Sequence, residues 1–472
     1  MPKTIFGTTE KSNFILNMKD DTIAKLPVIC VKLIAILFVI GQAVPELIEV
    51  ISKILGLGMG KAYGFLNTPF ICLAVVWVVS IIMIVIMISR KRFVKSVHTI
   101  PIVILGTFCL WSLISAIQSV SPLDSINGMY GRTTGFLTIL ACATILLLMT
   151  FINNEINLKS IIRLLVISSA VQCAWGFLQI ISYLFSFEMS YYENLNCISL
   201  YRVCLPSGFS GSPIFFAEYL GLMLGITLIL SCLDGNKFYM IMSVIYTYLM
   251  LDTHTIVGFV GFIVIMISTL IFVIINKSKN FLPMILCILM GIITYVVSIV
   301  LDGHFIFYDG AIIYQDSFYH LGITGTYWST SAEFNINDAS DVFKYMFNKG
   351  TQYIKYFPLF GVGEDCFIYT QLGDLESTVF IENGFDVIYN TYINIVATMG
   401  IPTLIIYIVG LIFCFIKIIP RLNDSNIFKG LLISMIAFTI MSFVSYTSIH
   451  ILPYFCVIFG VACSKKFEKS KN

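Results

Sequence analysis

Long apolar runs divide this chain and restrict what it can fold into. An α-helix needs about 20 residues to cross a hydrocarbon core about 30 Å thick, and we find twelve candidate runs of this kind. They lie near residues 27–46, 69–89, 99–118, 135–152, 160–186, 213–232, 237–252, 255–275, 281–301, 391–417, 427–446 and 448–464. Inside lipid the backbone must pair its own polar groups, which favours helices. The sequence therefore predicts an all-α polytopic membrane protein with about twelve transmembrane helices.

The composition agrees with bilayer solvation and limits the kinds of partner. Hydrophobic residues make up 58% of the chain and charged residues 11%, which lies outside the range of soluble proteins. The net charge of +2 predicts no nucleic-acid partner. Most of the 13 cysteines lie inside apolar runs, and only Cys197, Cys204 and Cys366 fall in predicted outer loops. A disulfide between Cys197 and Cys204 and two free thiols are equally expected, and the spacings predict neither a metal site nor a cofactor.

Lysine and arginine residues concentrate in alternate loops and predict the orientation. They are Arg90, Arg92 and Lys95, then Lys159 and Arg163, then Lys237, Lys277 and Lys279, and finally Lys417 and Arg421. The positive-inside rule makes these loops cytoplasmic. We therefore expect a multi-pass protein of the plasma membrane with both termini in the cytoplasm. The first apolar run lacks a small-residue cleavage pattern and is expected to remain as the first span.

One long polar segment interrupts the apolar pattern and divides the chain into three parts. We expect an N-terminal bundle of about nine helices over residues 1–301, a large extracytoplasmic loop over 302–388, and C-terminal helices with a cytoplasmic tail over 389–472. The loop is acidic and aromatic. Because structureless loops of this length are uncommon, it is expected to contain short helices and to pack on the mouth of the bundle.

A few polar residues in the predicted outer regions are candidates for a site. Arg132 and Arg202 break the positive-inside pattern, and two guanidinium groups at the outer face suit a pyrophosphate. Snorkelling at the interface or a structural ion pair is the alternative interpretation. Glu218 lies in an apolar run and is expected to face a cavity or a partner, unless its span begins later. Gly361 and Gly363 indicate a turn, which by itself is a weak signal.

Other chemistries have less support in the sequence. The segment from Gly56 to Ala62 has Ala62 where a phosphate loop needs a hydroxyl side chain. The first outer loop offers only Glu46 and Glu49 for a metal-assisted mechanism. The five histidines show no arrangement with a nucleophile, although His450 falls at an outer helix junction.

Four segments, taken in order, resemble the O-antigen ligase and polymerase superfamily of bacterial membrane glycosyltransferases. They are Ser121–Gly135 with Arg132, then Arg202 followed by Gly208–Tyr219, then Pro358–Gly363, and finally Asp386–Ile401. The resemblance covers residues 100 to 420. The chain departs from the family pattern at Ser212 and Ile214, which replace asparagines, and at Tyr389, which stands where the family's His-Asn pair has histidine.

The resemblance implies transfer of a glycan from a polyprenyl-pyrophosphate carrier, such as undecaprenyl pyrophosphate, to an acceptor hydroxyl at the outer face. It assigns Arg132 and Arg202 to the carrier pyrophosphate, and Tyr389, Asn390 and Asp386 to the catalytic position. Gly361, Gly363 and Glu218 would position the loop. The hydroxyl of Tyr389 is a poor base at neutral pH. Either Asp386 or another loop group supports catalysis, or the chain is a degenerate relative that only binds glycan.

The motifs do not encode the acceptor. A glycan acceptor would make the protein a surface polysaccharide polymerase, whereas a lipid or protein acceptor would make it an O-antigen-ligase-like enzyme. Outside this family, a transporter or flippase for lipid-linked oligosaccharide would also use outer arginines, but it should show paired halves and charges at the midplane. A structural scaffold is the third alternative, and in that case Arg132 and Arg202 would be replaceable.

Overall fold

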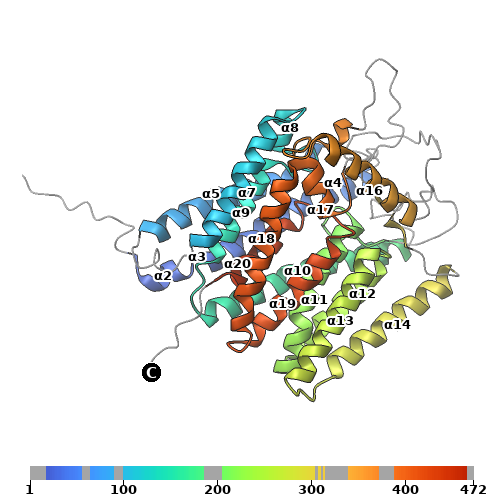
Figure 1. Cartoon of the computed structure of the whole chain (residues 1–472). Helices are drawn as coiled ribbons and strands as arrows, with labels where there is room; N and C mark the ends of the chain where they lie inside the picture. The colour runs from blue at the N-terminus through green and yellow to red at the C-terminus, as the bar shows by residue number, and fades with distance from the viewer. Residues whose placement is uncertain are drawn as a thin grey trace, which may run out of the picture.

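The computed structural model describes residues 18–55, 64–89, 99–184, 205–302, 307–309, 312–313, 339–370 and 387–464. Within these ranges all regular structure is helical, which confirms the all-α class. The helices pack into one bundle, with α14 at an edge of it (Figure 1). Cys197, Cys204, Arg202, Asp386 and much of the predicted loop lie outside the described residues, so the disulfide and the loop as a whole stay predictions.

Eight helices among the described residues are long and apolar enough to cross a membrane. The first combines α3 (Leu26–Leu33), the π-helical segment η1 (Ile34–Phe38) and α4 (Val39–Ile54). The others are α5 (Thr68–Ser89), α7 (Thr99–Ile117), α10 (Glu155–Leu184), α11 (Pro213–Asp234), α13 (Ile256–Ile275), α14 (Leu282–Asp302) and α18 (Ile401–Ile418). The span at the N-terminal end of the described chain is thus present as a helix, as its apolar run predicted.

The remaining four predicted runs form shorter helices. They are α9 (Phe136–Met149), α12 (Lys237–Asp252), α19 (Asn426–Met441) and α20 (Leu452–Ala462), which contain 14, 16, 16 and 11 residues. A straight helix of 11 residues is about 16 Å long and cannot cross a hydrocarbon core alone. The predicted number of about twelve spans is therefore not confirmed. Short α2 (Asp20–Ala24) and α8 (Pro122–Asn127) complete this part of the fold.

Part of the predicted 302–388 segment is helical. It contains α16 (Ala339–Tyr356) and the 3₁₀ turn η4 (Phe367–Thr370). Gly350 of α16 lies against Ile388 and Ile393, which places this helix beside the start of the C-terminal helices. The expectation that the segment contains helices is met in its described part.

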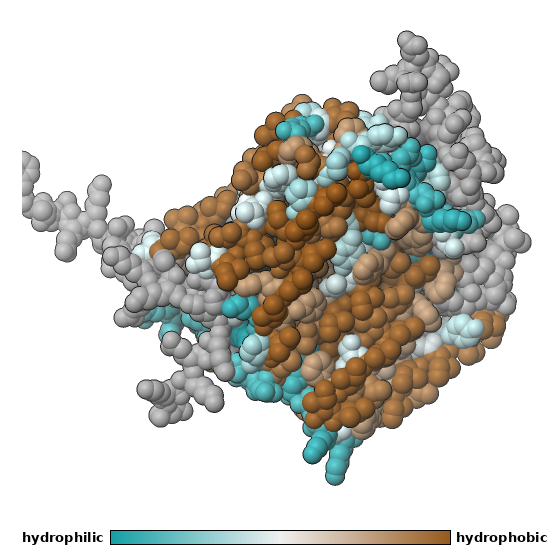
Figure 2. Space-filling model, viewed as in Figure 1, coloured by the Kyte–Doolittle hydropathy of each residue, from teal (hydrophilic) through white to brown (hydrophobic). Residues whose placement is uncertain are grey.

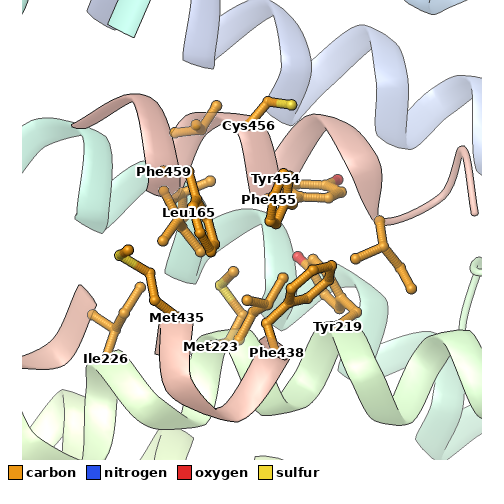
Figure 3. Packing of buried hydrophobic residues seen from close by; sticks show 14 of the residues in the cluster. Leu165, Tyr219, Met223, Ile226, Met435, Phe438, Tyr454, Phe455, Cys456 and Phe459 are labelled. Atoms are coloured by element: carbon orange, nitrogen blue, oxygen red, sulfur yellow. The ribbon is translucent and has the colours of Figure 1, made fainter. Parts of the chain in front are cut away.

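Helix α11 forms the centre of the bundle. Its most apolar stretch is fully buried, and it packs against α12, α13 and α19. Gly225 on α11 faces Ser434 on α19, whose hydroxyl donates a hydrogen bond of 2.6 Å to the carbonyl of Leu222. Small residues at such a contact allow two membrane helices to approach closely. Figure 3 shows the adjoining core, where Met223 of α11, Phe438 of α19 and Phe459 of α20 point toward one another.

The surface of the bundle is apolar along the helices and polar near their ends. Figure 2 shows brown side chains over the lengths of the helices and teal patches beyond them. Exposed isoleucine and valine side chains on α5, α13 and α14 belong to this apolar surface, for example Ile81, Ile267 and Ile292. Lipid chains would solvate such a surface, so the arrangement supports a membrane protein.

Hydrogen bonds join the chain segments at one end of the bundle, and this end is rich in lysine and arginine. Asn157 donates to the carbonyl of Ala24 at 2.6 Å, and Asn280 donates to the carbonyl of Ser231 at 3.0 Å. Arg421 donates to the carbonyl of Ser464 at 2.8 Å. We call this the basic end. Among the described residues, the segments around Lys159, Lys279 and Arg421 are thus each joined to a neighbouring segment at this end.

Candidate active site at the interrupted helix

The predicted span over 391–417 is interrupted by Gly400, which separates α17 (Thr391–Met399) from α18. Gly400 has a φ of +86°, and the added Cβ of any other residue would lie 2.0 Å from the carbonyl oxygen of Leu359. Pro402 follows at the start of α18 and has no N–H to donate to the carbonyl of Thr398. The expectation of one continuous helix was therefore wrong, because glycine and proline together end α17.

The carbonyl groups released by this break bind the Gly361–Gly363 turn. The backbone N–H of Val362 donates to Ala397 and that of Gly363 donates to Thr398, each at 2.9 Å. In return, the N–H of Ile401 donates to the carbonyl of Pro358 at 2.9 Å. The glycine turn that the sequence singled out is therefore the structural complement of an interrupted helix.

Helix α7 fixes the same turn from the other side. The hydroxyl of Ser115 donates to the carbonyls of Phe360 and Thr398, at 2.6 and 3.1 Å. The indole N–H of Trp111 donates to the carbonyl of Leu359 at 3.1 Å, and its ring stacks on Phe360 with centroids 5.3 Å apart. These contacts leave the turn little freedom.

A buried ion pair then joins the turn to the loop that contains Arg132. The guanidinium of Arg132 lies 2.5 Å from a carboxylate oxygen of Asp365, and the two side chains are 2% and 1% exposed. Arg132 also donates to the backbone carbonyl of Asp365 at 3.0 Å. The second carboxylate oxygen accepts the backbone N–H groups of Met129 and Thr134, at 2.6 and 3.3 Å. The structure thus shows Arg132 in an ion pair, one of the alternatives raised by the sequence, and its role toward a pyrophosphate stays a prediction.

Glu364, the residue before Asp365, lines an apolar groove. Its carboxylate accepts a hydrogen bond of 3.3 Å from the hydroxyl of Thr398. Burial, followed by repulsion from the charge of Asp365, raises the pKa of Glu364 to about 8, and the Thr398 hydrogen bond and the charge of Arg132 oppose that shift. Glu364 can therefore gain and lose a proton near neutral pH.

The groove is lined mostly by apolar side chains and by a few polar ones. It has a volume of about 160 Å³ and lies between α7, α9, α17, α18 and α20. Side chains such as Leu105, Leu146, Ile406 and Phe459 form the walls, and its polar lining residues are Thr134, Glu364, Thr391, Asn394, Tyr407 and Thr447. Such a lining suits a segment of an apolar chain beside a polar group.

Tyr389 and Asn390 lie beside this groove and do not line it. Tyr389 is 1% exposed, and its ring stacks on Phe215 and meets Tyr446 edge to face. The side chain of Asn390 accepts the N–H of Ile393 at 3.1 Å, as an N-cap of α17, and donates to the carbonyl of Phe443 at 2.9 Å. The catalytic role assigned to them stays a prediction, while Asn390 has a clear structural role.

Glu218 is buried in the first turns of α11. One of its carboxylate oxygens accepts a hydrogen bond of 2.8 Å from the hydroxyl of Ser445. Helix α11 begins at Pro213, so Glu218 lies inside the helix, and the depth at which the membrane span begins stays a prediction. Among the described residues, its partner is the Ser445 hydroxyl.

His450 lies at the end of a chain of hydrogen bonds that decides its tautomer. The N–H of Phe209 donates to Gln172 Oε1 at 2.7 Å, and Gln172 Nε2 donates to Gln42 Oε1 at 2.8 Å. Gln42 Nε2 is then a donor, and it lies 3.2 Å from His450 Nδ1. Because Nδ1 accepts, the ring proton of neutral His450 is on Nε2. His450 Nδ1 is therefore occupied and unsuited to act as a base.

No protein-family model matches this chain, and no curated protein matches it. The interpretation of the site therefore rests on its own residues. The sequence indicated only a glycine turn at this place, and Glu364 and Asp365 follow that turn directly. Two adjacent carboxylates between Gly363 and the apolar residues Cys366–Ile368 were the available signal for a buried acidic site.

Proposed function

We propose that this chain is a membrane glycosyltransferase that moves a glycan from a polyprenyl-pyrophosphate carrier to an acceptor hydroxyl at the outer face. The observation that supports this most directly is the groove, whose mostly apolar lining includes Glu364. An isoprenoid chain is apolar and would lie along the apolar side chains, while its pyrophosphate and first sugar would lie beside Glu364. The basic end would face the cytoplasm under the positive-inside rule, so Glu364 would lie toward the outer face.

Glu364 supplies the proton acceptor in this proposal. The carboxylate takes the proton of the acceptor hydroxyl while that oxygen attacks the anomeric carbon of the carrier-linked sugar. The bond between the anomeric carbon and the pyrophosphate oxygen breaks, and polyprenyl pyrophosphate leaves with the electron pair. Glu364 is preferred over Tyr389 because it lines the groove, whereas Tyr389 is packed among aromatic rings.

Arg132 and Arg202 have different places in the proposal. The charge of Arg132 is balanced by Asp365, so its contribution is to fix Glu364 beside the groove. The resemblance assigns Arg202 to the leaving pyrophosphate, where a cation would favour departure. Arg202→Ala should then lower the rate of transfer in the liposome assay described below.

The proposal predicts that transfer rises with pH through about 8. A base acts in its ionised form, and Glu364 has a pKa of about 8, so about a tenth of it is ionised at pH 7 and about half at pH 8. The initial rate should therefore increase about fivefold between these two values. The measurement is the rate of glycan transfer by purified protein in liposomes with carrier in excess.

Two variants separate Glu364 from other groups in this assay. Glu364→Gln should lower transfer by about 100-fold or more at every pH, as expected for loss of a general base. Asp21→Asn on α2 is the matched control, because Asp21 is exposed and does not line the groove, and this variant should transfer at the wild-type rate. Full activity of Glu364→Gln, together with loss of activity in Tyr389→Phe, would return the role of base to Tyr389.

A further inference from the structure

A second cavity lies at the basic end and is separate from the groove. It has a volume of about 900 Å³ and forms where α10 begins, α11 ends, α12 begins, and the chain enters α19 through the 3₁₀ turn η5 (Ile419–Arg421). Charged side chains of both signs line it. They are Lys159, Arg163 and Lys429, and Glu155, Asp234 and Asp424. Three cations and three carboxylates give a formal sum of zero.

The polar groups of this cavity are joined across several helices. Lys429 is 8% exposed, and its ammonium donates to the side-chain oxygens of Asn276 and Asn426, at 2.7 and 2.8 Å. Asn426 in turn donates to a carboxylate oxygen of Asp234 at 2.6 Å. Elsewhere in the lining, Lys159 pairs with Glu155 at 2.9 Å. Cations and carboxylates therefore lie close together at several positions of the cavity lining.

The cavity also borders the apolar surface of the bundle. Lys159, Arg163 and Ile167 follow one another at intervals of four residues and so lie on one face of α10. Ile167 is 48% exposed and Phe238, on α12, is 45% exposed, and both line the cavity. A ligand at this position would meet charged groups beyond the membrane core and apolar side chains toward it.

We propose that this cavity binds the headgroup of a zwitterionic phospholipid that has a primary ammonium next to its phosphate. Arg163 and Lys159 would bind the phosphate, with Asp234 and Asp424 accepting hydrogen bonds from the ammonium. The acyl chains would lie over Ile167 and Phe238. An anionic headgroup without an amine would place its negative charge beside three carboxylates and leave them without a cationic partner from the lipid.

The test measures which lipids the purified full chain retains. Protein is exchanged into detergent with equal amounts of phosphatidylethanolamine, phosphatidylcholine and phosphatidylglycerol, and bound lipid is quantified by native mass spectrometry. We expect at least tenfold preference for phosphatidylethanolamine over phosphatidylcholine, because a trimethylated amine cannot donate hydrogen bonds to the carboxylates. Soluble glycerophosphoethanolamine in excess separates headgroup recognition from lipid anchoring, and it should displace the lipid.

Arg163→Gln should lower the retained phosphatidylethanolamine at least fivefold. Lys417→Gln is the matched control, because Lys417 lies near the same end of the bundle on α18 and does not line the cavity. Equal retention of all three lipids would overturn the proposal. So would a preference for phosphatidylglycerol, or a phosphatidylethanolamine preference that Arg163→Gln leaves unchanged.

Discussion

Asp365→Ala is expected to destabilise the protein by about 3–5 kcal/mol, because it would leave Arg132 charged and buried without its carboxylate. The change also removes the acceptor of the Met129 and Thr134 N–H groups. Equilibrium unfolding in mixed micelles measures the free energy. Cys366 gives a local readout, because its thiol is fully buried next to Asp365 and should become reactive toward maleimide, as seen by peptide mass spectrometry.

Two other variants test whether the loss in Asp365→Ala comes from the unpaired buried charge of Arg132. The pair of Lys159 and Glu155 is exposed, with side chains 66% and 48% accessible, so Glu155→Gln should cost about 0–1 kcal/mol. The double variant Arg132→Met with Asp365→Leu removes both charges and should be more stable than Asp365→Ala. Equal stability of Asp365→Ala and the wild type would contradict the role of this pair in joining the two loops.

Gly361→Ala is expected to have an effect of similar size for a different reason. Gly361 has a φ of +67°, and an added Cβ would lie 2.2 Å from the carbonyl carbon of Thr398. The turn would have to leave the interrupted helix, so the Val362 and Gly363 hydrogen bonds would be lost with it. We expect a loss of at least about 3 kcal/mol, measured by the same unfolding experiment.

Gly235 provides the matched control. It also has a φ of +67°, but an added Cβ would meet no atom within 4 Å. Gly235→Ala should therefore cost only the strain of the left-handed conformation, about 1 kcal/mol. Equal losses for the two variants would show that the close approach to Thr398 does not matter.

The sequence predicted the helical class and the positions of most helices, because the apolar runs record which segments avoid water. Run 213–232, for example, became α11 (Pro213–Asp234). Hydropathy does not determine where a helix ends inside an apolar run. At Gly400 the close approach of the Leu359 carbonyl, from another segment of the chain, excludes a side chain. Glycine followed by Pro402 was the local signal for this break.

The candidate site was harder to predict because its residues meet only in the folded chain. Arg132 was found because it breaks the charge pattern, but its partner Asp365 lies 233 residues away. Spacing alone cannot indicate such a contact. Asn390 preceded an apolar helix and had the signature of an N-cap, which the family resemblance interpreted as catalytic. Glu364 became a candidate base only because the folded chain places its side chain in the lining of an apolar groove.

Reconstitution of the purified chain in liposomes tests the central claim most directly. Polyprenyl-pyrophosphate-linked glycan is supplied with acceptor, and product and free polyprenyl pyrophosphate are quantified together. The account predicts that both appear in equal amounts with wild type and that both fall about 100-fold or more with Glu364→Gln. Carrier that crosses the bilayer with its glycan still attached, and no release of polyprenyl pyrophosphate, would contradict it and identify a transporter.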